Sequence, residues 1–240
     1  MIEALGWGAL AASSLVIGAL LAFARRWSDA QVGTVLAFGA GALISAVSFE
    51  LVAEGAQVGG LGAIAIGLGL GAIVYYVADG LIGEGHKRGV PGRKQSSGAG
   101  TALALGAFLD GIPEQLVLGI GLAAGEGVSV GLIVAIFVSN LPEAIGSASE
   151  MIASGTARER VLRLWVAVAV ICTIASVVGY LIADAASGDL RAAINGFAGG
   201  ALLVMLIDSM IPEARTGAGR PAGLITVLGF AVAAGLSGLS

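Results

Sequence analysis

Long runs of apolar residues restrict the fold of this chain more than any other feature. Eight runs of about 18 to 26 residues can be counted, and a helix needs about 20 residues to cross a bilayer. With 57% hydrophobic and 12% charged residues, no water-soluble domain would need so much apolar surface. We therefore expect an all-α polytopic membrane protein with transmembrane helices at residues 5–24, 32–53, 58–78, 101–124, 128–153, 162–183, 192–211 and 222–239.

Positive charges lie in alternate connections between these runs. Eleven of the 12 Lys and Arg residues fall in the first, third, fifth and seventh connections, and only Arg191 does not. Because Lys and Arg are enriched in cytoplasmic loops, we expect these connections in the cytoplasm and both termini outside. This pattern predicts a multi-pass protein of the cell (cytoplasmic, or inner) membrane. The net charge of -4 is too small to argue for a partner, and no basic, aromatic-rich face indicates nucleic acid.

An internal repeat relates the second run to the seventh. Residues 38–43 match residues 197–202 at an offset of 159, and Glu54 matches Glu213 at the same offset. Five runs lie between them, so the two related helices would cross the membrane in opposite directions. We therefore expect one transmembrane domain over residues 1–240, with an inverted repeat of helices 1–3 and 6–8 enclosing helices 4 and 5. Inverted repeats with broken helices at their interface are typical of transporters.

The fourth and fifth runs share the same interruption. Residues 110–114 read Asp-Gly-Ile-Pro-Glu and residues 139–143 read Ser-Asn-Leu-Pro-Glu, which superposes Glu114 on Glu143. Each proline removes a helical hydrogen bond, so we expect a kink near mid-membrane at Pro113 and Pro142. Ionisable groups inside a membrane are costly, and their default interpretation is a functional site.

The polar residues around these prolines share helix faces. Asp110 and Glu114 lie four apart, and Ser139, Asn140, Glu143, Ser147 and Glu150 follow at helical spacings. If the two faces meet, crowded carboxylates in an apolar site need a cation, or else protons, to be stable. A divalent metal ion meets that need best. The alternative is that the carboxyl groups are protonated and bond to nearby backbone.

The Pro-Glu motifs, the eight runs, their orientation and the inverted repeat resemble the ZIP (Zrt/Irt-like) family of metal-ion transporters. Residues Pro113, Glu114, Asn140, Pro142 and Glu143 match the family's His-Asn-x-Pro-Glu-Gly-like motifs. The resemblance implies eight helices with both termini outside and a metal site on helices 4 and 5. It implies metal ligands at Glu114 and Glu143, with Asp110, Asn140, Ser139 and Glu150 beside them.

The chain departs from the family pattern at the motif histidines. Asp110 and Ser139 stand where histidines are usual, and Gln115 stands in place of a glycine. The glutamate that the family often supplies from helix 6 is absent, with Ser176 as the best match for that position. Oxygen ligands suit harder ions, so the substrate is zinc or a harder ion such as manganese or iron, with cadmium also to be tested.

Other acidic residues lie at the ends of the second and seventh runs. Glu50, Glu54, Asp208 and Glu213 are either solvated helix ends or points where the cation enters or leaves the protein. Cys172 is interpreted as a small packing residue.

These features predict a ZIP-like secondary transporter that moves divalent metal ions into the cytoplasm, and not an enzyme. No cofactor is required, and the expected partners are the lipid bilayer and the transported metal. The oligomeric state stays open, with a homodimer as one option. One alternative is a transporter of another solute with Asp110, Glu114 and Glu143 as a proton relay. Another is a membrane protein that keeps the fold without transport.

Overall fold

The structure, a computed structural model, describes the backbone of residues 1–87, 99–123, 130–185 and 187–237. It describes their side chains except those of residues 81–87, 99–110, 150 and 184–185. Within this described part every regular element is a helix, as expected. The elements are α1 (Ile2–Ala24), α2 (Asp29–Ala46), the π-helix η1 (Val47–Ala53), α3 (Glu54–Lys87), α4 (Ala99–Ala123), α5 (Val130–Ala153), α6 (Arg158–Ala185), α7 (Gly188–Met205), the π-helix η2 (Leu206–Met210), α8 (Ile211–Ala218) and α9 (Ala222–Ser237).

Five helical stretches of the described part are long and apolar enough to cross a membrane. Two shorter apolar helices accompany them, at Gly111–Ala123 and Ala222–Ser237. The long stretches are Ile2–Ala24, Asp29–Gly80, Val130–Ala153, Arg158–Ala183 and Gly188–Ala218. The chain is therefore an all-helical, polytopic membrane protein.

The start of α2 follows from local side-chain chemistry. Ser28 accepts a hydrogen bond from the backbone N–H of Gln31, and the Gln31 side chain accepts one from the backbone N–H of Ser28. This capping box satisfies N–H groups that would otherwise lack a partner at a helix N-terminus. Arg25 also donates to the Gln31 side chain at 2.6 Å, which ties the α1–α2 connection to the new helix.

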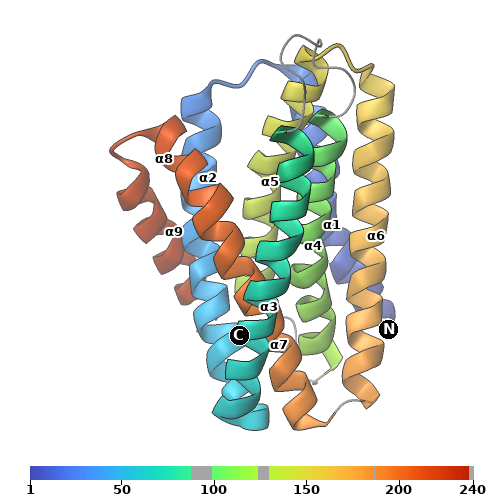
Figure 1. The fold of residues 1–240 in the computed structure, drawn as a ribbon, viewed down its shortest axis with the longest axis vertical. Helices are drawn as coiled ribbons and strands as arrows, with labels where there is room; N and C mark the ends of the chain where they lie inside the picture. Colours follow the sequence, from blue (N-terminus) through green and yellow to red (C-terminus); the bar gives the residue numbers. More distant parts are fainter. Residues whose placement is uncertain (88–98, 124–129, 186, 238–240) are drawn as a thin grey trace.

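The second expected helix does not end where its pattern of residues predicted. The chain stays helical through η1 and on past residue 57, and the break comes at Gly60, with φ 82° and ψ 162°. Glycine adopts this positive φ without steric penalty. In Figure 1 the chain reverses direction between α2 and α3. The connection expected at residues 54–57 is therefore helical, and the third helix begins beyond Gly60.

The seventh expected helix is also longer than predicted. Helix α7 passes through η2 into α8 and ends at Ala218, where Gly219 adopts φ 68°. The two π-helices begin at Val47 and Leu206, and 206 − 47 = 159, which equals the offset of the sequence repeat. Both π-helices thus lie at matching positions of the repeated sequence.

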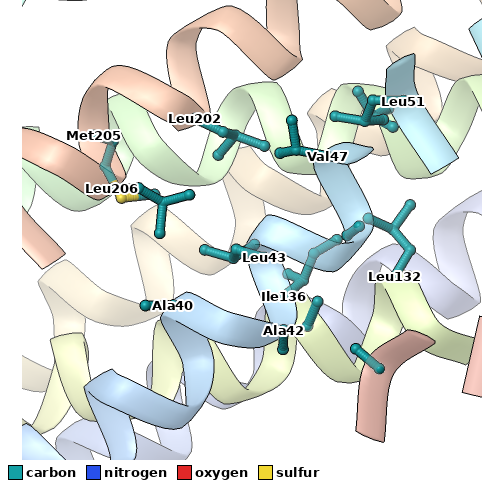
Figure 2. Close-up of a cluster of buried hydrophobic side chains, with 14 of the residues drawn as sticks. Ala40, Ala42, Leu43, Val47, Leu51, Leu132, Ile136, Leu202, Met205 and Leu206 are labelled. Carbon is teal, nitrogen blue, oxygen red and sulfur yellow. The ribbon is translucent and has the colours of Figure 1, made fainter. Parts of the chain in front are cut away.

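The core lies where α2 and η1 pack against α5, α7 and η2. Figure 2 shows Leu43 and Val47 beside Leu202 and Leu206, with Ile136 of α5 on the other side. Their side chains are almost fully buried. This cluster fixes the position of α5, which carries half of the predicted site, against α2 and α7.

Close contact between α3 and α7 depends on glycine. A Cβ on Gly200 would meet the backbone carbonyl of Leu68. Small residues at such positions let transmembrane helices approach closely enough for backbone contact.

The ends of the bundle differ in charge. The connections α1–α2, α5–α6 and α8–α9 lie at one end, and the N-terminus and the α6–α7 connection lie at the other (Figure 1). The first group carries arginines such as Arg25, Arg158 and Arg220, and we call this end the basic end. The arrangement agrees with the pattern of charges in the sequence.

Candidate metal site

Glu114 of α4 reaches the fifth helix. Its side chain is 1% exposed, and its Oε1 accepts a hydrogen bond from the Ser139 hydroxyl at 3.5 Å. Ser139 is also buried and lies 3.0 Å from the carbonyl of Ile136, one turn earlier on α5. The two Pro-Glu helices therefore meet at Glu114 and Ser139.

The prolines lie inside helices that continue past them. Pro113 is interior to α4 and Pro142 is interior to α5. The kink expected at each proline stays a prediction. Glu114 and Glu143 each directly follow a proline inside a continuous helix. Glu114 lies where α4 contacts α5, through Ser139.

A pocket of about 50 Å³ opens beside this contact. It lies between α2, α5, α7, η2 and α8, and we call it the α5–α8 pocket. Its polar lining comes from Ser139, Asn140 and Glu143 of α5, Ser209 of η2 and Glu213 of α8, and its apolar lining from Leu36, Met205 and Met210. Three predicted ligands thus face one cavity, together with Glu213, which the sequence placed at a helix end.

Asn140 is the buried amide of this pocket. It is 2% exposed, and its Nδ2 has no hydrogen-bond partner among the described residues. Buried polar groups are usually satisfied, so an unpaired donor in a polar cavity points to water or another occupant.

Helix α6 supplies a neighbour that sequence reasoning missed. Cys172 is 0% exposed. A Cβ placed on Gly111 would lie only 2.7 Å from its Sγ, so the absence of a side chain there lets α6 approach α4. Cys172 therefore packs against α4 one turn before Glu114.

Ser176, the sequence's best match for the helix-6 glutamate of the family, contacts α1. Its hydroxyl donates to the carbonyl of Ala4 at 3.1 Å, one helical turn beyond Cys172. A Cβ on Gly8 would touch Ser176 and lie 3.3 Å from Oε1 of Gln115. Ser176 and Gln115 therefore both lie at the contact with α1.

The other acidic residues separate into different places. Glu50 lies in η1 and accepts a hydrogen bond from Ser237 at the end of α9 at 2.6 Å. Glu54 is half-buried at the start of α3, and Asp208 is exposed on η2 without lining the α5–α8 pocket. Of the four outer acidic residues, Glu213 is therefore the one that the structure brings to Glu143.

Two predicted ligands fall outside the described side chains. The backbones of Asp110 and Glu150 belong to α4 and α5, and their side chains lie outside the described residues. Within the described part, no group of three or more His, Cys, Asp or Glu side chains is arranged to hold a metal ion. The described oxygen ligands therefore form two groups. Glu114 is hydrogen-bonded to Ser139, and Glu143 lines the α5–α8 pocket.

The site gathers carboxylates with neutral hydroxyl and amide groups. Carboxylates in an apolar bundle require a cation or a proton to balance their charge. Ser139, which bonds to Glu114, lines the same pocket as the exposed Glu213.

Comparison with known proteins gives one partial similarity. No family model matches the chain. A protein of Arabidopsis thaliana described as "Putative zinc transporter" is 25% identical over 206 residues, which make up 85% of this chain and 33% of the plant protein. The chain therefore spans about a third of the length of this relative.

Proposed function

We propose that this protein is a ZIP-like secondary transporter that carries divalent metal ions across the cell membrane into the cytoplasm. The observation that carries the proposal is the meeting of two Pro-Glu helices at Glu114 and Ser139, next to a pocket that holds Glu143. The similarity to a plant protein described as a putative zinc transporter supports the same class of substrate.

Glu114 and Glu143 are the principal metal ligands in this proposal. Their charges offset a dication, and Ser139 and Asn140 add neutral oxygen atoms from the same helix face. Asp110 lies one turn before Glu114 on α4 and adds a carboxylate to this set, and Glu150, two turns beyond Glu143 on α5, is a further candidate ligand. Zinc, manganese, iron and cadmium are the candidate ions.

The cation path runs from one end of the bundle to the other. Glu50 and Glu54 serve the end opposite the basic end, and Asp208 and Glu213 serve the basic end, which faces the cytoplasm. Both termini are then outside, and the eight crossings form an inverted repeat. The related bundles on either side of α4 and α5 alternate access to the site.

No covalent step is part of this function, so the protein is not an enzyme. The lipid bilayer and the metal ion are its partners, without a resident cofactor. A homodimer is compatible with the proposal but plays no part in the site.

The test uses the full chain in liposomes loaded with a metal-sensitive dye. Glu114→Gln and Glu143→Gln keep side-chain volume and remove a charge, so each should weaken zinc and manganese binding more than about tenfold and slow uptake. Glu159→Gln is the control, because Glu159 is exposed and pairs only with Arg163 at the surface in the contacts the structure describes.

Two results would contradict the proposal in different ways. Parent-like metal uptake by both glutamine variants would exclude the carboxylates as ligands. Proton movement that depends on another solute but not on metals would favour the proton-relay alternative, and metal binding without uptake would favour a non-transporting protein.

A further inference from the structure

Two thioether side chains line the α5–α8 pocket beside its carboxylates. Met205 is 4% exposed and Met210 is 5% exposed, and both share the cavity with Asn140 and Glu143. A pocket built only of carboxylate, hydroxyl and amide oxygens would favour hard cations. Sulfur in the same cavity changes the chemistry that it offers.

The π-helix explains why both methionines face one cavity. Met205 and Met210 are five residues apart, a spacing that in an α-helix separates side chains by more than a quarter turn. In η2 the backbone N–H of Ile211 bonds to the carbonyl of Leu206, which is the five-residue spacing of a π-helix. Residues at that spacing stack on one side, so η2 brings the second methionine to the pocket.

Met210 is held in place by the packing of α2 on α5. A Cβ on Gly39 would lie 2.9 Å from Cε of Met210 and 3.1 Å from Cα of Ser139. The missing side chain of Gly39 therefore leaves space that the Met210 methyl group occupies, next to the helix that carries Ser139. The thioether is a fixed part of the wall.

The buried amide of Asn140 is part of the polar lining of the pocket. Asn140 is 2% exposed, and its Nδ2 has no partner among the described residues. This amide lines the same cavity as the two thioethers and Glu143. Its carbonyl oxygen is a neutral ligand type for a cation, and Glu143 adds a negative charge.

We propose that Met205 and Met210 are specificity-determining ligands, which make the α5–α8 pocket a station for soft and borderline cations such as Cd²⁺ and Zn²⁺ in preference to Mn²⁺. The inference rests on the proposed transport of metal ions and names the ions that this pocket selects. Thioether sulfur is a soft donor, and Glu143 and Glu213 supply the charge that a thioether lacks. Oxygen ligands alone would favour a hard ion such as Mn²⁺, so the two sulfur atoms reverse the expected order of affinities.

The experiment measures the affinities of the purified full chain for Cd²⁺ and Mn²⁺ by competition with an indicator dye. Met205→Leu, Met210→Leu and the double variant keep an apolar side chain of similar volume. The double variant should bind Cd²⁺ about tenfold more weakly while its affinity for Mn²⁺ stays unchanged. Met151→Leu is the matched control, because Met151 is equally buried but packs in a separate cluster with Trp165.

The outcomes separate this inference from the proposed function. A double variant that binds Cd²⁺ as tightly as the parent would overturn the ligand role of the methionines. Equal loss for both ions would overturn it as well, since that result marks the methionines as packing residues. A parent chain that binds neither ion would refute metal transport itself, and this inference with it.

Discussion

Glu114 and Glu143 have different surroundings although they follow the two prolines in the same way. Glu114 is buried at the α4–α5 contact and bonds to Ser139, whereas Glu143 is partly exposed and faces the α5–α8 pocket. A buried carboxylate is the more strongly dependent on a nearby cation or proton. The two glutamates therefore differ in their access to the cavity: Glu143 lines it and Glu114 does not.

The first prediction concerns Glu213, which lines the pocket with Glu143. Glu213→Gln should weaken metal binding by about threefold, less than Glu143→Gln, because an exposed carboxylate is screened by water. Glu159→Gln is the matched control, since Glu159 is exposed and pairs with Arg163 at the surface. Dye competition measures all three variants, and equal effects of Glu159→Gln and Glu213→Gln would remove Glu213 from the path.

Cys172 was a packing residue in the interpretation of the sequence, and its burial agrees with that role. The structure adds that it packs against Gly111 of α4, three residues before Glu114. Only the folding of α6 against α4 places it there, because no spacing along the chain relates residue 172 to residue 111.

At the scale of elements, helix contacts depend on positions without side chains. Helix α7 lies against α3 through Gly200, whose Cβ would meet the Leu68 carbonyl. A backbone carbonyl in a neighbouring helix cannot rotate away as a side chain can, so a methyl group there must separate the two helices.

The second prediction follows from this contact. Gly200→Ala should lower the free energy of unfolding by about 1–3 kcal/mol, as overpacking of a tight contact does. Gly69→Ala on α3 should be neutral or slightly stabilising, because a Cβ there meets nothing within 4 Å and alanine favours a helix. Thermal unfolding in detergent, followed by tryptophan fluorescence, compares the two, and equal melting temperatures would contradict the contact.

The described part of the chain is helical, as expected, and the ends of the helices were the least predictable feature. Four glycines lie at positions 55, 59, 60 and 62, and the pattern of residues does not single out the one that breaks the helix. The structure selects Gly60 through its positive φ. The π-helices also went unpredicted, because a five-residue hydrogen-bond spacing leaves no local signal in the sequence.

At the scale of the whole molecule, charge and fold agree on two unlike ends. Arginines gather in the α1–α2, α5–α6 and α8–α9 connections at the basic end. The α6–α7 connection, with Asp189 near it, lies at the other end.

The third prediction is the orientation of these ends in the membrane. An impermeant thiol reagent added to intact cells should label Asp189→Cys, while Arg160→Cys should react only after the membrane is opened. The native Cys172 is fully buried and should contribute little background. Labelling of Arg160→Cys in intact cells would reverse the orientation, and with it the direction in which Glu213 would release the cation.

The sequence by itself determined the helical class, the membrane character and the two Pro-Glu helices. These follow from the length of apolar runs and from proline chemistry, which act locally along the chain. The tertiary structure alone decided which distant atoms meet: Glu114 with Ser139, Cys172 with Gly111, and Glu213 with Met205 and Met210 beside Glu143. Such meetings depend on how α5, α6 and α7 pack, and packing selects among many pairings that the same local pattern would allow.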